Sequence, residues 1–311
     1  MILCLDGGTT NTRIRLMDGT EERDVISASA GSNHKNNKEL REAVKKMIRE
    51  ILERNALTEK DIPVIMACGM VTSELGLFEL PHILTPAGKE DFRNGVKKVL
   101  LEDVSGIPFC FIPGVKEAVR MPNIMRGEET ECLGLIRQYH ITEPLVLILP
   151  GSHNKVISFD GEKITAIYSM MSGEILAALS GHTILKNTLP EKLPKTFDRE
   201  ALLEGAEECR KYGLTGAALR ERTIGLSKEK SDEWLTSFLA GTVLYSDIVA
   251  IREKAGGKKL LIGGGNPLRE EVAALCRAYL ENEITVADEE TAVLAAALGA
   301  AGLWEDLKEK L

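Results

Sequence analysis

A short buried strand that enters a polar Gly-rich loop and is followed by a second strand occurs twice in this chain. The first copy has an apolar run at residues 2–5, the loop DGGTTN at 6–11 and an alternating strand at 13–17. The second has an apolar run at 145–149, the loop PGSHNK at 150–155 and a hairpin around Asp160-Gly161. The two copies share a structural pattern rather than a sequence. They predict two α/β domains, each carrying one such loop.

Helical and strand patterns alternate through the rest of the chain. Apolar residues at helical spacing predict a helix across 40–52, and further helices are expected within 173–252 and at 290–301. Short apolar runs predict strands at 63–67, 109–112, 260–262 and 284–287. We therefore expect a first domain at residues 1–125 and a second at 126–311. The boundary should lie inside a helix near 123–140, and the last helix is expected to pack back on the first domain.

Composition and charge narrow the function classes. With 311 residues the chain exceeds what one core usually serves. A net charge of −8 argues against nucleic-acid binding through phosphate contacts. Six cysteines without C-x-x-C or zinc spacing predict reduced, mostly buried thiols. The apolar run at residues 2–5 is too short for a signal peptide, and we expect no membrane span of ~20 apolar residues. A cytoplasmic protein without nucleic-acid or membrane partners is expected, and a homodimer is compatible with the sequence.

The two Gly-rich loops have the chemistry of phosphate binding. Glycines let the backbone approach a phosphate, and backbone N–H groups and hydroxyls can donate to its oxygens. A carboxylate at a strand end can hold hydrated Mg²⁺. The alternative is a pair of polar turns with an Asx cap, and no Walker or dinucleotide motif is present. The candidates are Asp6, Gly7, Gly8, Thr9, Thr10 and Asn11, with Asp6 as metal ligand, and Gly151, Ser152, His153 and Lys155.

A third Gly-rich segment, GGGNP at 263–267, follows an apolar run and precedes a helical pattern. Three glycines allow a flat ligand such as adenine to lie against the backbone, and a helix N-terminus favours an anion. A plain helix-entry loop is the alternative. The candidate residues are Gly263, Gly264, Gly265 and Asn266.

Two further segments carry carboxylates. In MRGEET at 125–130, Arg126 is a candidate anion clamp and Glu128 or Glu129 a candidate general base. Acidic residues in a helix first turn are the alternative. Residues 132, 135 and 136 are apolar and follow Glu128 at i+4, i+7 and i+8, which favours Glu128 as the residue above the apolar stripe. In MSGE at 171–174, Ser172 can cap a helix whose first turn contains Glu174.

These segments, in this order, resemble the sugar-kinase, actin and Hsp70 superfamily, and within it the 2-dehydro-3-deoxygalactonokinase family. The resemblance rests on DGGTTNTR at 6–13, ACGMVTSELG at 67–76, PNIMRGEET at 122–130, LPGSHNK at 149–155 and MSGE at 171–174. Gly7 departs from the bulkier residue, often Trp, that this family leads us to expect, and Val156 departs from an aromatic. Residues 190–230 carry no recognised motif. The resemblance implies two actin-like, ribonuclease H-like domains with the active site in the cleft between them.

The resemblance further implies transfer of the ATP γ-phosphoryl to the terminal hydroxyl of 2-dehydro-3-deoxy-D-galactonate. Both loops would hold the phosphates and Mg²⁺, and residues 263–266 would line the adenosine site. An analogy with exopolyphosphatases favours the first Glu of the pair as base, with Arg126 facing the transferred phosphoryl or the substrate carboxylate. Substrate contacts are expected from Asn33, Met70, Ser73, Thr85 and Glu174.

Other functions on the same fold stay open. An exopolyphosphatase-like hydrolase shares the paired Glu residues and both loops, but a long anionic substrate favours a basic groove, which a net charge of −8 does not suggest. A kinase of a different sugar acid would use the same ATP loops. A sugar-responsive regulator would carry an N-terminal helix-turn-helix, whereas here the first loop strand starts at residue 2.

Overall fold

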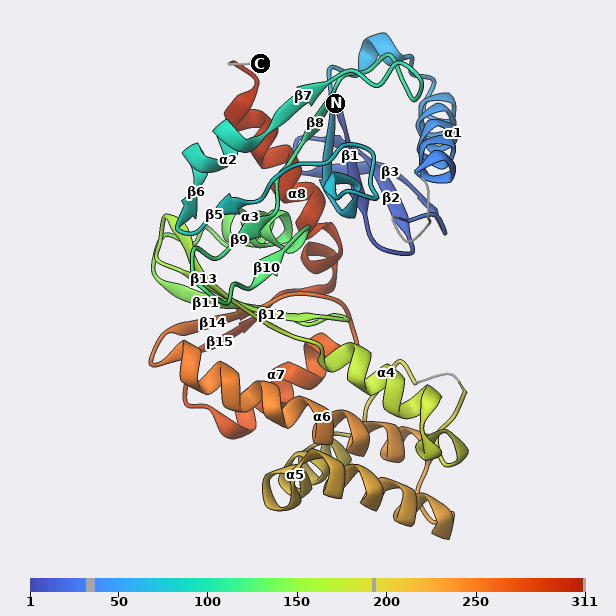
Figure 1. Ribbon diagram of the computed structural model, residues 1–311, viewed down its shortest axis with the longest axis vertical. Helices are drawn as coiled ribbons and strands as arrows, with labels where there is room; N and C mark the ends of the chain where they lie inside the picture. Colours follow the sequence, from blue (N-terminus) through green and yellow to red (C-terminus); the bar gives the residue numbers. More distant parts are fainter. Residues whose placement is uncertain (32–36, 192–193, 310–311) are drawn as a thin grey trace. The chain divides into compact units, whose positions relative to one another are not determined.

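The computed structural model describes residues 1–31, 37–191 and 194–309, and its internal contacts divide the chain into two units (Figure 1). Unit 1 comprises Met1–Glu143, Asp160–Ile167 and Glu289–Leu311. Unit 2 comprises Pro144–Phe159 and Tyr168–Asp288. Each unit contains a mixed β-sheet with helices packed on it, so the predicted two-sheet α/β architecture is confirmed.

The main sheet of unit 1 has six strands in the order β3-β2-β1-β4-β8-β7. The central strand β1 is antiparallel to β2 and parallel to β4, with Gly7 opposite Gly69. Because β1 and β4 are parallel, their C-terminal ends lie side by side at one edge of the sheet. The strands are β1 (Ile2–Gly7), β2 (Thr12–Asp18), β3 (Glu21–Ala28), β4 (Ile65–Gly69), β7 (Lys97–Val99) and β8 (Phe109–Phe111).

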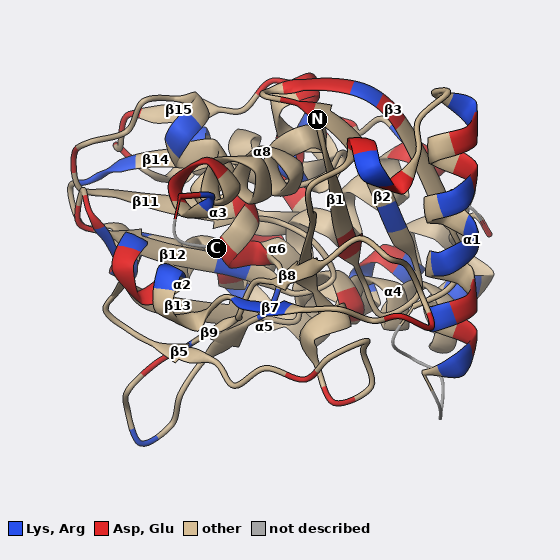
Figure 2. Ribbon diagram, turned by 90° about the horizontal axis from the view of Figure 1, so that it is seen from above, with Lys and Arg blue, Asp and Glu red and all other residues tan. Residues whose placement is uncertain are grey.

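Helices cover both faces of this sheet. Leu3 and Leu5 of β1 lie in the same buried cluster as the apolar face of α1 (Lys38–Arg54). Cys4, which points to the opposite face, donates through its thiol to the carbonyl oxygen of Ala297 in α8 (Glu289–Leu307). The strand β1 is therefore buried on both sides, with α1 and α8 flanking it (Figure 2).

The helix α3 (Glu128–Gln138) packs against α8 through glycines. A Cβ atom at Gly134 would lie within 3.0 Å of the carbonyl oxygen of Ala295, and one at Gly299 within 3.0 Å of the carbonyl oxygen of Thr130. This close packing places α3 in unit 1, and the chain enters unit 2 after Glu143. The sequence analysis gave the domain ranges 1–125 and 126–311, with the boundary near 123–140. The contact between α3 and α8 could not be foreseen, because helices so distant in sequence leave no local pattern of their pairing.

The remaining elements of unit 1 are short. A second sheet has the order β10-β9-β5, and β6 pairs with the first part of β13. Two-residue strands have no measurable periodicity, so none of these strands was predicted. The elements are β5 (Ile83–Leu84), β6 (Ala87–Gly88), α2 (Lys89–Gly95), β9 (Val115–Lys116), β10 (Ile124–Met125) and the 3₁₀ helices Glu59–Asp61 and Met70–Thr72.

Unit 2 repeats the strand pattern found around β1. Its strands have the order β15-β14-β11-β12, followed by β13, and the central β11 is antiparallel to β12 and parallel to β14. The second Gly-rich loop therefore follows β11 as the first follows β1. The elements are β11 (Leu145–Leu149), β12 (Asn154–Phe159), β13 (Lys163–Met170), α4 (Ser172–His182), the 3₁₀ helix Ile184–Asn187, α5 (Arg199–Ser227), α6 (Asp232–Ala255), β14 (Lys259–Ile262), α7 (Leu268–Tyr279) and β15 (Ile284–Val286).

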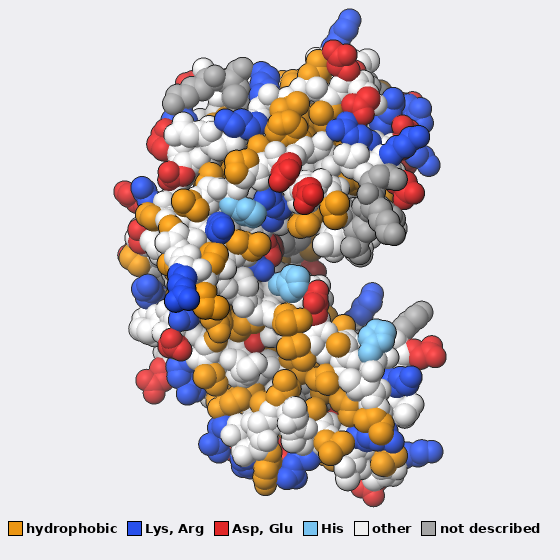
Figure 3. Space-filling model, in the orientation of Figure 1, with side chains coloured by type: hydrophobic (Ala, Val, Ile, Leu, Met, Phe, Trp, Pro, Cys, Tyr) orange, Lys and Arg blue, Asp and Glu red, His pale blue; other side chains and the backbone are white. Residues whose placement is uncertain are grey.

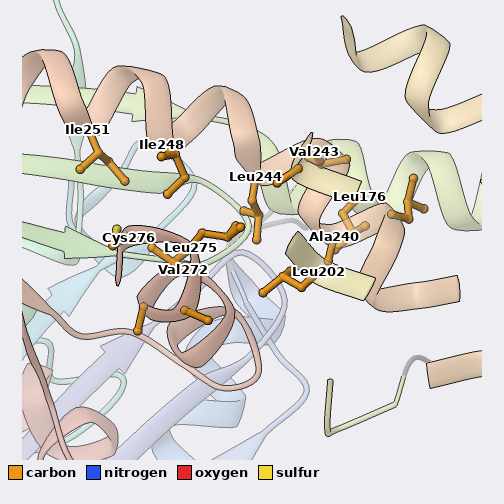
Figure 4. Close-up of a cluster of buried hydrophobic side chains, with 14 of the residues drawn as sticks. Leu176, Leu202, Ala240, Val243, Leu244, Ile248, Ile251, Val272, Leu275 and Cys276 are labelled. Carbon is orange, nitrogen blue, oxygen red and sulfur yellow. The ribbon is translucent and has the colours of Figure 1, made fainter. Parts of the chain in front are cut away.

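The helix α6 is the core helix of unit 2. Leu244, Ile248 and Ile251 of α6 face apolar side chains of α7, as Figure 4 shows. Within the described residues, α6 is the one helix that is long and apolar enough to cross a membrane, a stretch that the sequence analysis had not expected. Its most apolar window, with a mean hydropathy of 1.5, is 78% buried within the protein. Packing in the core accounts for this composition.

The six cysteines are all free and buried, as predicted. Burial raises the pKa of Cys4 and of Cys276 to about 12. Protonated, inaccessible thiols are poor nucleophiles and poor metal ligands.

The contact between α3 and α8 predicts a stability effect. Replacing Gly299→Ala should lower the free energy of unfolding by about 1–3 kcal/mol, because the new methyl group overlaps the α3 backbone. Gly181→Ala is the matched control, since Gly181 also lies in a helix but a Cβ there meets nothing within 4 Å. Urea unfolding of both variants measures the difference. Equal midpoints would show that α3 and α8 are not closely packed.

Candidate functional site

Three backbone segments of unit 1 converge at the C-terminal end of β1. Gly69, at the end of β4, has a φ of +79°, and a Cβ there would lie 3.2 Å from the Asp6 carboxylate. Gly127, just before α3, has a φ of +115°, and a Cβ there would lie 3.3 Å from the Cα atom of Gly69. Positive φ and close approach both favour glycine at these positions. The contacts bring the carboxylate of Asp6 to the start of α3.

The first loop closes tightly and leaves its polar groups accessible. The backbone N–H of Gly8 donates to the carbonyl oxygen of Asn11 over 2.8 Å, and residues 8–11 are all exposed. A pocket of about 330 Å³ lies beside the loop. It is lined by Asp6, Gly8, Asn11, Thr12, Arg13, Ser27, Ala28 and Ser29. Of the loop residues predicted to contact phosphate, Gly8 and Asn11 line this pocket together with Asp6.

Asp6 lies in a mixed electrostatic field. Burial raises its pKa, the positive charges of Arg13 and Arg15 lower it, and the negative charge of Glu128 raises it again. Asp6 lines the pocket beside the loop, and its carboxylate is a suitable ligand for a divalent cation. The described residues form no preformed cluster of three His, Cys, Asp or Glu ligands. Mg²⁺ commonly takes one or two carboxylates together with phosphate and water oxygens, and the metal role of Asp6 stays a prediction.

Position 7 is restricted by the segment that follows β4. A Cβ atom at Gly7 would lie within 3.0 Å of the Val71 side chain. With Val71 in place, no bulky residue fits here. Val71 therefore occupies the space that the bulkier residue expected at position 7 would need.

The two glutamates of α3 have different surroundings. Glu129 is fully buried, and its two carboxylate oxygens accept the backbone N–H of Gly127 at 2.9 and 2.8 Å. Burial, followed by the charge of Glu128, raises the pKa of Glu129 to about 7. Glu128 is half-buried, and its carboxylate accepts the backbone N–H of Arg126 at 2.9 Å. Glu128 is therefore the more accessible carboxylate of the pair.

The apolar positions 132 and 135 that follow Glu128 are buried, as the helical spacing predicted. The buried face of α3 contains Glu129, Thr130, Cys132 and Leu135, and Glu128 lies outside it. The spacing therefore located part of this face but did not separate Glu128 from Glu129. The choice of Glu128 as base stays a prediction, and it now depends on accessibility.

Arg126 connects the start of α3 to the segment after β4. One terminal nitrogen of its guanidinium donates to the carbonyl and hydroxyl oxygens of Thr72, both at 2.6 Å. The other donates to the carbonyl oxygen of Leu80 and lies 3.1 Å from a ring nitrogen of His82. Burial, then the charges of Arg126 and Lys116, lower the pKa of His82 to about 4, so its ring is neutral. These contacts give Arg126 a role in organising residues 72–82, and contact with phosphoryl or substrate stays a prediction.

The expected substrate contacts are distributed unequally. Met70 and Ser73 directly follow Gly69, and the Ser73 hydroxyl donates to the carbonyl oxygen of Met70 at 2.7 Å. Thr85 follows β5, and its hydroxyl accepts the backbone N–H of Ala118 at 3.4 Å, so it is not placed with the other two. Asn33 lies outside the described residues.

In unit 2, the second loop is built against the N-terminus of α4. A Cβ at Gly173 would lie within 3.0 Å of the carbonyl oxygen of Gly151, and the backbone N–H of Glu174 donates to the Ser152 carbonyl at 3.1 Å. His153 pairs with the Glu174 carboxylate at 3.0 Å. The structure thus brings together the two predicted segments PGSHNK and MSGE.

The members of the second loop differ in accessibility. Ser152 and His153 are exposed, whereas Lys155, in β12, is only 4% exposed. Val156 is buried in the unit 2 core, where an aromatic had been expected. Ser152 and His153 are therefore the accessible donors, and the predicted phosphate contact of Lys155 is not tested.

The third Gly-rich segment borders the second loop. Gly264 has a φ of +77°, and a Cβ there would lie within 3.0 Å of Pro150. A pocket of about 270 Å³ adjoins Asn266. It is lined by Lys195, Thr196, Phe197, Asn266, Pro267 and Glu270. Phe197 and Pro267 provide apolar surface against which a planar base can pack. The sequence analysis did not single out residues 195–197, because they belong to no recognised motif.

A second residue missed from sequence lies beneath the second loop. Asp247 of α6 is 2% exposed and accepts hydrogen bonds from the side chains of Asn154 and Ser172. Its one sequence signal is a charged residue within the apolar stretch at 243–251.

Comparisons with known proteins identify the family of the chain. The family model described as 2-keto-3-deoxy-galactonokinase matches residues 6–305. The 2-dehydro-3-deoxygalactonokinase of Escherichia coli (strain K12) is 24% identical over 257 residues, covering 81% of this chain and 80% of that protein. The crystal structure of a candidate 2-dehydro-3-deoxygalactonokinase from Sinorhizobium meliloti has a TM-score of 0.80 at 20% identity, covering 99% of this chain and 97% of that chain.

A more distant structure shares the fold alone. The activator of the 2-hydroxyisocaproyl-CoA dehydratase from Clostridium difficile, solved with bound ADPNP, has a TM-score of 0.54 at 15% identity and covers 99% of this chain and 96% of that chain. The family match extends from Asp6 to Glu305 and includes every described candidate residue of both units. The chain therefore belongs to the 2-keto-3-deoxy-galactonokinase family of kinases, with an actin-like fold.

Proposed function

We propose that this protein transfers the γ-phosphoryl group of ATP to the terminal hydroxyl of 2-dehydro-3-deoxy-D-galactonate, giving the 6-phosphate, in galactonate and galactose catabolism. The observation that supports this most directly is the position of Asp6 in the pocket beside the exposed first loop, with the charge of Glu128 acting on it. That arrangement offers one carboxylate for a metal and one for the acceptor hydroxyl, in a chain whose family is shown from residue 6 to 305.

The reaction requires positioning and charge neutralisation more than covalent help from the protein. The hydroxyl oxygen of the sugar acid bonds to the γ-phosphorus, the bond from that phosphorus to the β–γ bridging oxygen breaks, and ADP leaves. The hydroxyl proton passes to the carboxylate of Glu128. The N–H groups of residues 9–11 and the hydroxyls of Thr9 and Thr10, all in exposed residues, hold phosphate oxygens. Asp6 would hold Mg²⁺, which when bound neutralises charge on the phosphates.

In this proposal unit 2 carries its own candidate contacts for a nucleotide. Ser152 and His153 are the exposed donors of the second loop and suit phosphate oxygens. The pocket beside Asn266 suits the adenine ring, with Phe197 and Pro267 as its apolar walls. Lys195 lines the same pocket and adds a positive charge to it.

The substrate assignment predicts a clear preference in a coupled ADP-release assay. The purified protein should use 2-dehydro-3-deoxy-D-galactonate with a kcat/KM at least about 100-fold above that for glucose, glycerol or acetate, because a site that binds a carboxylate and hydroxyls rejects ligands lacking them. The 2-dehydro-3-deoxy-D-gluconate epimer is the matched comparison. Equal use of glucose, glycerol or acetate would contradict the assignment. Hydrolysis of polyphosphate without an acceptor would also contradict it. A long anionic substrate favours a basic groove, whereas basic and acidic side chains are interspersed on the face shown in Figure 3.

The metal role of Asp6 predicts that Asp6→Asn loses most Mg²⁺-dependent turnover, since an amide is a weak Mg²⁺ ligand. Urea unfolding should show that the variant still folds. Asp18→Asn, at the other end of the β1–β2 hairpin, is the matched control and should keep wild-type turnover. The measurement is initial rate against Mg²⁺ concentration at saturating ATP and sugar acid. Near wild-type rates for Asp6→Asn at low Mg²⁺ would show that Asp6 caps the turn and does not bind the metal.

The different surroundings of the two glutamates of α3 predict different effects when each is replaced. Glu128→Gln keeps shape but accepts no proton, so turnover should fall by about 10²–10⁴-fold with little change in ATP affinity. Glu129→Gln should have a milder effect on turnover and should lower stability, because its carboxylate holds the backbone N–H of Gly127. Rates under saturating sugar acid, measured side by side, separate them.

Glu131→Gln is the control for this pair, as a third acidic residue of the same helical turn. An inactive Glu129→Gln beside an active Glu128→Gln would reverse the choice of base. If both variants are active, the base lies elsewhere, and Glu174 is the next candidate.

A further inference from the structure

A single buried carboxylate in unit 2 contacts two segments that are far apart in sequence. Asp247 lies in the middle of α6 and is 2% exposed. Its Oδ2 atom accepts a hydrogen bond from the side-chain amide of Asn154 at 2.5 Å. Its Oδ1 atom accepts one from the hydroxyl of Ser172 at 2.6 Å. One side chain of the core helix thus holds both the second loop and the first residue of α4.

The two residues held by Asp247 determine the shape of the loop. The side-chain oxygen of Asn154 accepts the backbone N–H of Gly151 at 2.8 Å, which closes the loop on itself. Ser172 begins α4, and two residues later the backbone N–H of Glu174 donates to the carbonyl of Ser152 at 3.1 Å. The exposed donors of the loop therefore sit on a backbone that is fixed from both ends through Asp247.

The chemistry of this network differs from that of an ordinary core contact. Burial raises the pKa of Asp247, and hydrogen bonds from Ser172, Asn154 and Ser246 lower it. All three of these donors are neutral. A buried carboxylate without a cation costs stability compared with an apolar residue of similar size. Core packing alone does not account for an aspartate at this position, whereas directional bonds to two loop segments do.

We propose that Asp247 is a positioning residue for nucleotide binding, which through Asn154 and Ser172 fixes loop 151–154 and the start of α4 in the orientation that bound phosphates require. The proposal rests on the kinase function proposed above. Asp247 itself touches no phosphate, because its side chain lies beneath the loop, buried in the core. Its effect is transmitted by the two hydrogen bonds.

The test compares Asp247→Asn with Thr242→Val, a matched change in the same buried helix. An amide at position 247 accepts on one side only, so one of its two donors loses its partner. The hydroxyl of Thr242 donates to carbonyl oxygens of Phe238 and Gly205 and has no contact with the loop. Both variants should be less stable in urea. Only Asp247→Asn should weaken MgADP binding, measured by titration calorimetry, by about tenfold.

Steady-state kinetics should separate the substrates. In Asp247→Asn the KM for ATP should rise about tenfold, since a loosened loop holds phosphates less well, while the KM for the sugar acid stays within about twofold. Ser172→Ala removes one of the two bonds and is the gentler variant if Asp247→Asn folds poorly. Because Asp247 and Ser172 act through the same bond, the double variant should lose less than the product of the two single effects.

The outcomes are distinguishable. Equal weakening of MgADP binding by Asp247→Asn and Thr242→Val would overturn the positioning role in favour of general loosening of α6. So would unchanged binding in both Asp247→Asn and Ser172→Ala. A wild-type protein that binds no MgADP would instead overturn the kinase proposal, and the inference with it.

Discussion

The candidate site of unit 1 depends on the close approach of three backbone segments that contain glycine. Gly7 lies opposite Gly69 in the parallel pairing of β1 and β4, and Gly127 packs its backbone against Gly69. Any side chain at Gly69 would collide with β1, and both Gly69 and Gly127 have positive φ. Because the backbones meet, the carboxylate at the end of β1 and the carboxylates at the start of α3 interact electrostatically. Packing thus creates the electrostatics of the site.

In unit 2, hydrogen bonds in addition to backbone packing hold the segments of the candidate site together. Its loop follows the central strand β11 just as the first follows β1, and each central strand has one antiparallel and one parallel neighbour. Gly173 and Gly264 again permit close backbone approach to the loop. The loop conformation, however, is held by a buried polar network centred on Asp247. A directional network fixes orientation where backbone packing alone leaves freedom.

Sequence predicted the parts of this structure that have local signals. Both strand–loop–strand patterns and the long helices have clear periodicity, so they were found. The strand β3 was missed because its residues are half-exposed and mostly polar, which gives no apolar alternation. The boundary after Glu143 depends on Gly134 and Gly299, which become neighbours only when α3 meets α8.

The candidate site divides in the same way. Each Gly-rich loop and the MRGEET segment is a continuous stretch of sequence, so each was recognisable as a motif. Phe197 and Asp247 were not, since each acquires its place only through contact with a distant segment. Arg126 was recognised as important, but its contacts with Thr72 and Leu80 arise from tertiary structure that no spacing rule contains.

The glutamate pair shows how one helix turn can separate two carboxylates by role. Glu129 is enclosed, accepts two hydrogen bonds from one backbone N–H, and has a pKa raised to about 7, so a substantial fraction is protonated at neutral pH. A neutral Glu129 reduces the negative charge that faces Glu128 and Asp6. Asp6 lines the pocket beside the first loop together with Arg13, and repulsion from the charge of Glu128 raises the pKa of Asp6. A divalent cation with nucleotide phosphates would relieve that repulsion, and an accessible carboxylate left beside the acceptor hydroxyl is what proton removal requires. Different environments therefore distinguish the two glutamates of α3, and their division into a base and a buried partner stays a prediction.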